Sequence, residues 1–226
     1  MTNAKEAAGR RAAEFVEDGM TLGLGTGSTV FFTLQALGER VSDGLRIRCV
    51  PTSIDTEVRA KEFGIPLVTL EEVRELDLTI DGADEIDPDF HMIKGGGGAL
   101  LREKIVARAS NRVVIVADSG KVVDRLGLKF LLPIEVVPFA RHVITRELEK
   151  LGGTPVLRIA DKNKTYLTDN GNEILDTRFE NGIEDPPALE RTLASIPGIV
   201  ESGIFVGLAH VLVVGNDGGE AEVRER

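Results

Sequence analysis

Two kinds of apolar segment alternate along the first half of the chain. Short, continuously apolar runs predict buried strands, and longer segments with apolar residues every three or four positions predict helices. The expected order is helix 3–17, strand 20–24, helix 28–37, strand 46–50, helix 52–63, strand 76–80, helix 99–109 and strand 112–117. Asn3 followed by Glu6 is typical of a capping box at the start of the first helix. This alternation predicts an α/β fold with a Rossmann-like, doubly wound parallel sheet.

The rhythm changes near residue 132. The pattern there predicts strand 134–137, helix 140–151, strand 155–160, a Thr168-Asp169-Asn170-Gly171 turn, strand 173–179, helix 186–195 and strand 199–206. The order β-α-β-β-α-β is typical of a ferredoxin-like α+β domain. The apolar run 210–214 predicts an inner strand that rejoins the first sheet. We therefore expect a Rossmann-like domain of residues 1–131 and 207–226, with a small α+β domain inserted at 132–206.

The composition argues against a nucleic-acid partner. The chain has 27 Lys and Arg against 37 Asp and Glu, a formal net charge of −10, and 4% aromatic residues. A negative net charge repels polyanions at long range, and few aromatic side chains are available to stack on bases. A small phosphate ester remains compatible with this charge, because local lysines and oriented backbone N–H groups decide its binding.

No segment has the length and apolar character of a membrane span. The most apolar run, residues 203–215, contains His210 and is shorter than the roughly 20 residues that a bilayer requires. Residues 1–11 are polar and lack the apolar core of a secretory signal, so we expect a cytoplasmic protein without a membrane segment. Cys49 is the only cysteine, which excludes an intramolecular disulfide and a cysteine-based zinc site.

A glycine-rich segment, Gly23-Leu24-Gly25-Thr26-Gly27-Ser28-Thr29, separates the first predicted strand from the helix that follows. Backbone N–H groups at a helix N-terminus favour a phosphate, and Ser28 is the expected N-cap. The segment lacks the third glycine of a dinucleotide fingerprint and the lysine of a P-loop. We expect phosphate binding by Thr26, Gly27, Ser28 and Thr29; a plain strand-to-helix turn also uses glycine and stays open as an alternative.

A cluster of acidic residues, Asp81-Gly82-Ala83-Asp84-Glu85-Ile86-Asp87, follows the predicted strand 76–80. Carboxylates at the C-terminal end of a parallel strand face the usual ligand crevice, where sugar hydroxyls are suitable partners. Two alternatives stay open. The cluster has enough oxygens for Mg²⁺ or Ca²⁺, although without EF-hand spacing. Glu85, Asp87 and the nearby Asp89 are also typical turn and cap residues.

Four consecutive glycines, Gly95 to Gly98, connect Lys94 to the predicted helix that carries Glu103. Ordering such a loop costs much backbone entropy, which is easier to explain if the chain passes close to a substrate. Glu103 has apolar neighbours one helical turn away and so is a candidate base, but a helical glutamate is more often solvated. These patterns alone leave its role open. Lys121, after the strand 112–117, and Lys5 are further candidates for the crevice.

Together these segments closely resemble the motifs of A-type ribose-5-phosphate isomerases, in both order and spacing. The resemblance rests on Gly25 to Thr29, Asp81 to Glu85, Lys94 to Ala99 and Arg102-Glu103-Lys104. It continues through Leu132-Pro133-Ile134-Glu135-Val136, Thr168-Asp169-Asn170-Gly171-Asn172 and Ile196-Pro197-Gly198-Ile199-Val200. It therefore covers nearly the whole chain.

The resemblance implies an aldose–ketose isomerase that acts on a pentose phosphate without cofactor or metal, as a homodimer or a dimer of dimers. It assigns Glu103 as general base and Asp81, Asp84 and Lys94 as further catalytic groups that handle the sugar. The substrate-binding residues that it implies are Thr26, Gly27, Ser28, Thr29, Lys5, Lys121, Gly95, Gly96 and Gly97.

Two competing interpretations come from other proteins on similar scaffolds. A non-catalytic sugar-phosphate effector domain needs a phosphate site but no proton-transfer base, so Glu103 beside Asp81 and Lys94 favours an enzyme. A CoA transferase or an amino-sugar phosphate deaminase shares parts of the scaffold but not the full set of motifs.

Overall fold

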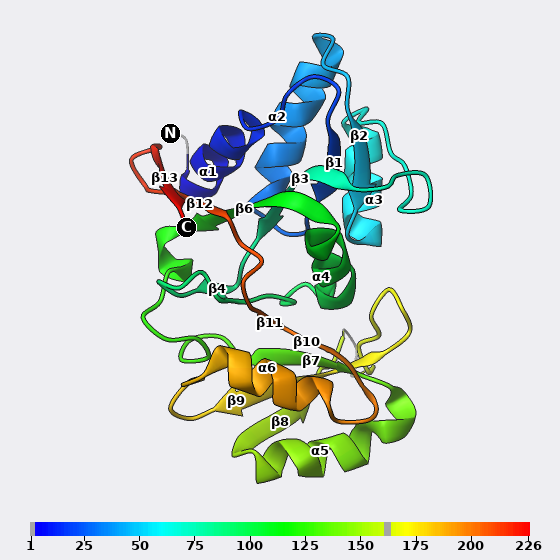
Figure 1. Cartoon of the computed structure of the whole chain (residues 1–226), viewed down its shortest axis with the longest axis vertical. Helices are drawn as coiled ribbons and strands as arrows, with labels where there is room; N and C mark the ends of the chain where they lie inside the picture. Colours follow the sequence, from blue (N-terminus) through cyan, green and yellow to red (C-terminus); the bar gives the residue numbers. More distant parts are fainter. Residues whose placement is uncertain (1–2, 161–163) are drawn as a thin grey trace. The chain divides into compact units, whose positions relative to one another are not determined.

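Two compact units make up the computed structural model, which describes residues 3–160 and 164–226 (Figure 1). Unit 1 consists of Met1–Ala83, Arg102–Val122 and Leu208–Arg226, and unit 2 consists of Asp84–Leu101 and Val123–Gly207. Unit 2 contains the whole segment 132–206 and also includes the glycine loop and residues 123–131. The assignment of 132–206 as a separate domain stays a prediction.

A six-stranded sheet forms the centre of unit 1, in the order β13-β12-β6-β3-β1-β2. Its strands are β1 (Thr21–Leu24), β2 (Arg48–Pro51), β3 (Leu76–Gly82), β6 (Ser110–Asp118), β12 (Val211–Gly215) and β13 (Ala221–Glu225). All pairs are parallel except β12 with β13, which confirms the Rossmann-like fold and the inner position of β12. The edge strand β13 was not predicted, because its sequence, Ala-Glu-Val-Arg-Glu, is largely polar and exposed.

Helices cover both faces of this sheet. On one face, α1 (Ala4–Ala13) and α2 (Val30–Ser42) bury a core that includes Leu22, Leu24 and Val116. The opposite face carries Gly23, whose added Cβ would lie 2.4 Å from Val106 of α4 (Leu100–Arg108). α1 begins where the sequence predicts a helix cap, since Asn3 is its N-cap and the Asn3 side chain accepts a hydrogen bond from the N–H of Glu6 at 2.9 Å.

The strand order also predicts where a ligand crevice lies in unit 1. β1 lies between β2 and β3 in the sheet. The connection from β1 leads to β2 on one side, whereas the later strands β3 and β6 lie on the other side of β1. Ligands of open α/β sheets bind at such a switch point, outside the carboxyl ends of the strands. The loops that follow β1 and β3 therefore frame the expected site. α3 (Ile54–Glu62), which follows β2, begins beside them.

Unit 2 contains an antiparallel sheet in the order β10-β7-β9-β8. Its strands are β7 (Leu132–Val136), β8 (Gly153–Leu157), β9 (Glu173–Phe179) and β10 (Ile199–Ser202), with helices α5 (Arg141–Lys150) and α6 (Pro186–Ala194). If β7, β8, β9 and β10 are numbered 1 to 4 along the chain, their order in the sheet is 4-1-3-2. The chain order of strands and helices is β-α-β-β-α-β, as the sequence pattern predicts for a ferredoxin-like arrangement.

The single strand predicted at 199–206 is wrong. The chain forms β10 and then β11 (Ile204–Phe205), which joins a separate small sheet with β5 (Met92–Ile93) and β4 (Glu85–Ile86). Gly203 lies at the change of sheet, where an added Cβ would be 2.4 Å from the carbonyl oxygen of Lys94. Glu201, Ser202 and Gly203 interrupt the apolar pattern at this point, but so short an interruption does not by itself predict the end of a strand.

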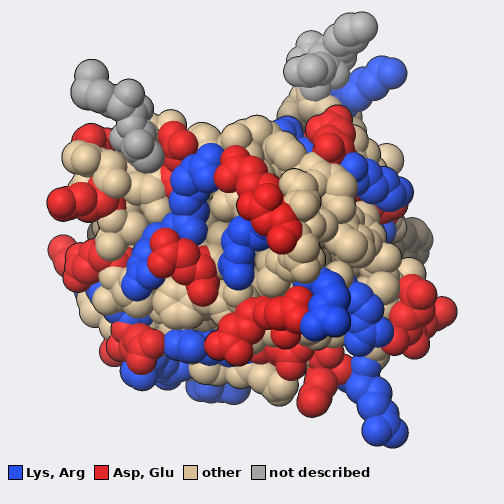
Figure 2. All heavy atoms as spheres, turned by 90° about the horizontal axis from the view of Figure 1, so that it is seen from above, with Lys and Arg blue, Asp and Glu red and all other residues tan. Residues whose placement is uncertain are grey.

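Charged side chains of both signs are interspersed on the face seen in Figure 2. Exposed ion pairs of the described residues include Arg10 with Glu39 at 2.9 Å. The hydrogen bonds from Arg46 lower the pKa of Asp18 to about 2. Within the described residues, no helix has the length and apolar character needed to span a membrane.

Candidate active site

The loop after β1 is shaped by its contact with Asp81, at the end of the neighbouring strand β3. The N–H of Gly25 donates to the carbonyl of Ile80 at 2.9 Å, and the N–H of Thr26 donates to Asp81 Oδ1 at 3.1 Å. An added Cβ at Gly25 would lie 2.0 Å from the same Oδ1. Asp81 is 1% exposed. The glycine is therefore required for the loop to pass this carboxylate.

The Thr26 hydroxyl belongs to a cluster of four hydroxyl groups. Its Oγ1 lies 2.9 Å from Thr52 Oγ1, 2.8 Å from Ser53 Oγ and 3.0 Å from Thr56 Oγ1. Thr56 in turn donates to the carbonyl of Gly25 at 2.7 Å. These bonds tie the loop to the start of α3. The sequence analysis missed Thr52, Ser53 and Thr56; the only signal was a run of hydroxyl residues directly after β2.

α2 begins later than predicted. Its first residue is Val30 and Thr29 is the N-cap, without a side-chain hydrogen bond to the helix. Ser28 is therefore not the N-cap, because Gly27, with φ +120°, and Ser28 still belong to the turn. Instead, Ser28 Oγ accepts a hydrogen bond from Lys5 Nζ at 2.9 Å. Lys5 thus contacts the loop that follows β1, and its role in substrate binding stays a prediction.

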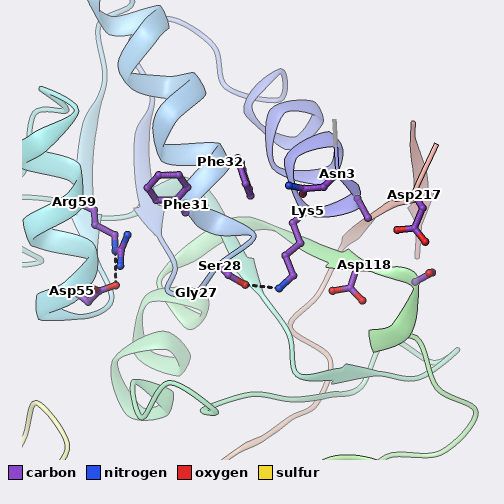
Figure 3. A pocket seen from close by; sticks show the side chains of 12 residues that line it. Asn3, Lys5, Gly27, Ser28, Phe31, Phe32, Asp55, Arg59, Asp118 and Asp217 are labelled. Carbon is purple, nitrogen blue, oxygen red and sulfur yellow. Dashed lines mark hydrogen bonds and ion pairs between the residues drawn. The ribbon is translucent and has the colours of Figure 1, made fainter. Parts of the chain in front are cut away.

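A pocket of about 810 Å³ opens at this end of unit 1 (Figure 3). Figure 3 shows Lys5 reaching from α1 to Ser28, with Asp118 on the same side and the rings of Phe31 and Phe32 above. Arg59 is held by Asp55 at 2.8 Å. Lys121 is not part of the pocket lining. The full lining is Asn3, Ala4, Lys5, Gly27, Ser28, Phe31, Phe32, Asp55, Arg59, Asp118, Ser119 and Asp217.

Glu103 is buried, with 4% of its surface exposed. It lies in the first turn of α4, the helix that directly follows the glycine loop in sequence. The neighbouring Lys104 is also buried, at 5%. The usual expectation for a helical glutamate, a solvated surface position, is thus wrong here. A buried carboxylate is shielded from bulk water, as a proton-transfer group requires.

In unit 2, Asp84 holds the glycine loop that follows Lys94. One of its carboxylate oxygens accepts a hydrogen bond from the N–H of Gly96 at 2.7 Å. Lys94 is 3% exposed, and its Nζ lies 5.5 Å from the centre of the Phe205 ring. Gly96 and Gly97 are exposed, while Gly95 is buried. The loop therefore has two exposed glycines close in sequence to a buried lysine.

The other acidic residues of this motif have structural roles. Glu85 accepts backbone hydrogen bonds from Gly127 at 2.5 Å, Lys129 at 2.8 Å and Phe130 at 2.7 Å. Asp87 accepts from the N–H groups of Asp89 and His91. In residues 3–160 and 164–226, no group of three or more His, Cys, Asp and Glu side chains is arranged to hold a metal ion.

Replacing Glu85 by glutamine is expected to lower the free energy of unfolding by about 2–3 kcal/mol, because an amide N–H₂ would face a buried N–H donor. Chemical denaturation of the two proteins measures the loss. Glu180→Gln, the same change at an exposed glutamate of unit 2, is the control and should leave stability unchanged. Equal stability of Glu85→Gln and the parent protein would contradict the structural role.

Comparison with known proteins decides the family. The family model of ribose 5-phosphate isomerase A (phosphoriboisomerase A) matches residues 48–219. A ribose-5-phosphate isomerase A from Bacillus mycoides is 50% identical over 222 residues, which cover 98% of this chain and 100% of the relative. The chain belongs to the ribose-5-phosphate isomerase A family. It is therefore an isomerase.

Solved structures of the ribose-5-phosphate isomerase A family share the fold over the full chain. The enzyme from Methanocaldococcus jannaschii has a TM-score of 0.93 and 39% identity, with 98% of each chain covered. A ribose-5-phosphate isomerase in complex with phospho-erythronic acid has a TM-score of 0.95 and 39% identity, with 100% of each chain covered.

Each unit brings together part of the residue set that the family resemblance implies. In unit 1, Asp81 contacts Thr26, and Lys5 contacts Ser28. In unit 2, Asp84 contacts Gly96, two residues after Lys94. Arg158 and Tyr166, which follow β8 and hold the loop Gly95–Gly98, were missed, because no local pattern links them to residues 60 or more positions earlier.

Proposed function

We propose that this chain interconverts D-ribose 5-phosphate and D-ribulose 5-phosphate through an enediolate, with Glu103 as general base. The full-length similarity to ribose-5-phosphate isomerases A carries the proposal. The reaction moves a carbonyl from C1 to C2, which requires removal of the C2 proton and its return at C1. A single carboxylate can perform both transfers. The burial of Glu103 supports this role, since water then competes less for the proton.

Asp81, Asp84 and Lys94 serve as the other catalytic groups. Asp81 assists ring opening, Lys94 stabilises the oxyanion that develops on the substrate, and Asp84 handles the sugar and orders the loop. Lys94 supports this assignment, since a buried ammonium acts on a developing anion more strongly than a solvated one. Gly95, Gly96 and Gly97 form the substrate-binding loop; Asp84 accepts from the N–H of Gly96, and the N–H of the exposed Gly97 is a further donor toward the substrate.

The phosphate binds at the start of α2, where Gly27, Ser28 and Lys5 line one pocket. The uncapped N-terminus of the helix adds oriented N–H groups and a favourable dipole for an anion. Thr26 and Thr29 shape the loop around the phosphate. Lys121 contributes positive charge from the end of the 3₁₀ helix at Ser119–Lys121.

The physiological setting follows from the same family membership. The reaction belongs to the non-oxidative pentose phosphate pathway, and we expect a cytoplasmic enzyme that uses no cofactor or metal. We also expect a homodimer or a dimer of dimers. A nucleic-acid partner is not expected, because the net charge is −10.

Purified protein in EDTA is expected to convert ribose 5-phosphate to ribulose 5-phosphate with robust turnover, since every proposed group is a side chain or backbone group of the chain. Ribulose 5-phosphate formation is measured directly, and phospho-erythronic acid should act as a competitive inhibitor. A non-catalytic effector domain would instead bind ribose 5-phosphate without turnover. Activity that is lost in EDTA and restored by a divalent cation would contradict the metal-free mechanism.

A further inference from the structure

The glycine loop of unit 2 cannot fix its own shape. Gly95 and Gly98 have φ values of +97° and +83°, and the N–H of Gly98 donates to the carbonyl of Gly95 at 2.9 Å. Without side chains, each glycine retains more backbone freedom than any other residue. Fixing the backbone of each residue costs conformational entropy, so an ordered loop needs partners from elsewhere in the fold.

Two side chains outside the motif bind three consecutive carbonyls of this loop. Arg158 Nη1 donates to the carbonyls of Gly95 at 3.0 Å and Gly96 at 3.1 Å. Tyr166 Oη donates to the carbonyl of Gly97 at 3.1 Å. Asp84 accepts from the N–H of Gly96, so the loop backbone is held through one N–H group as well as through three carbonyls.

Arg158 is itself fixed in place. Its Nε and Nη2 donate to the two oxygens of Asp176 at 2.8 and 2.5 Å, and its guanidinium lies 5.6 Å from the centre of the Tyr166 ring. Both members of the ion pair are largely buried, with 14% and 18% of their side chains exposed. The fork geometry of arginine allows it to bind Asp176 and the loop carbonyls together, which a lysine cannot do.

The position of these residues in the sheet explains their access to the loop. Leu175 of β9 belongs to the core with Ile144 of α5 and Leu193 of α6. Side chains alternate across a strand, so the next residue, Asp176, lies on the opposite face of the sheet, away from the two helices. The face of the ferredoxin-like sheet away from its helices therefore carries Asp176 and its partner Arg158.

Tyr166 also accounts for one of the four glycines. An added Cβ at Gly98 would lie 2.1 Å from Tyr166 Oη and 2.6 Å from its Cζ. Burial raises the pKa of the Tyr166 phenol, so the hydroxyl keeps its proton and remains a donor to Gly97. A glycine at position 98 thus leaves the space that the Tyr166 side chain occupies.

We propose that Arg158 and Tyr166, with Asp176 behind them, are positioning residues that set the geometry of the Lys94–glycine loop for the isomerisation. This inference rests on the proposed role of that loop in stabilising the oxyanion. A trans peptide places its C=O and the following N–H on opposite sides. Because Arg158 binds the Gly96 carbonyl, the N–H of Gly97 points away from Arg158, and this N–H of an exposed residue is the donor that we assign to the oxyanion.

The test compares Arg158→Met and Tyr166→Phe with Arg141→Met. Arg141 forms a 3.0 Å ion pair with Glu173 in the same unit, so its loss is a matched control that does not contact the loop. Steady-state kinetics gives kcat and KM, and amide hydrogen exchange of residues 94–101 reports the order of the loop. Thermal unfolding shows whether each variant is folded.

Arg158→Met should lower kcat/KM by about 10- to 100-fold, mainly through kcat, and Tyr166→Phe by about threefold to tenfold. In both variants the loop amides should exchange faster while the rest of unit 2 is unchanged. Arg158→Lys, which keeps the charge but not the fork, should not restore the activity. Arg141→Met should stay within twofold of the parent in kcat/KM.

The inference is overturned if Arg158→Met keeps kcat/KM within twofold, or if its loop exchanges at the parent rate. It is also overturned if Arg141→Met, at a similar loss of thermal stability, loses as much activity. A failure of the proposed function would look different, because the parent protein would then bind ribose 5-phosphate without converting it. Hydrogen exchange of the loop still decides the positioning role in that case.

Discussion

Glu103→Gln is expected to lower kcat by a factor on the order of 10² to 10⁴, the contribution typical of a positioned general base. Glutamine has nearly the same shape, so the buried position can be filled, but its amide cannot accept the C2 proton. KM should change little, because the phosphate and sugar contacts remain. Isomerisation assays and solvent-hydrogen exchange into the product measure the loss of proton transfer.

Glu173→Gln provides the matched control for this experiment. Glu173 is also a buried glutamate, at 7% exposure, but it pairs with Arg141 in unit 2. Its substitution should reduce stability and leave kcat within about twofold of the parent, since the lost ion pair touches none of the proposed reacting groups. Near-normal turnover of a folded Glu103→Gln variant would rule out Glu103 as the base.

Local sequence patterns predicted most of the framework, because buried strands and amphipathic helices each have a characteristic period. The strand predicted at 173–179 matches β9 (Glu173–Phe179) residue for residue. The same pattern failed where only three residues, Glu201 to Gly203, separate two apolar runs at a change of sheet, and where an edge strand is polar, as in β13. The period of apolar residues indicates which side chains are buried, but it does not indicate which sheet a strand joins.

The candidate site was predicted less completely, for reasons that particular residues make clear. The burial of Glu103 depends on tertiary packing, and the adjacent Lys104 is buried as well. Neither the charge of Glu103 nor its position in the helix could therefore distinguish it from a solvated surface residue. Arg158 binds carbonyls more than 60 residues earlier, through atoms that leave no trace in local sequence. Only the resemblance to a family supplied the role of Glu103, and nothing in the sequence supplied that of Arg158.

Gly25→Ala is expected to reduce stability by about 1–3 kcal/mol and to lower kcat/KM by about 10²-fold. The new Cβ would lie 2.0 Å from Asp81 Oδ1 and 2.5 Å from Asp81 Cα, so rotation of the side chain cannot relieve the whole clash. Backbone retreat is also opposed, since the N–H of Gly25 donates to Ile80 across the β1–β3 pair. Asp81 must therefore move, and the loop with it.

Gly82→Ala separates this effect from the general cost of adding a methyl group beside Asp81. The nearest atom to its Cβ would be the carbonyl oxygen of Thr26 at 3.6 Å, an ordinary contact. Denaturation and kinetics of both variants should show a large loss for Gly25→Ala and a small change in stability for Gly82→Ala. In a double-mutant cycle, Asp81→Ala should recover part of the stability lost in Gly25→Ala, because it removes Oδ1 and Cγ but not Cα. Strict additivity of the two changes would show that the contact between Gly25 and the Asp81 carboxylate does not constrain the loop.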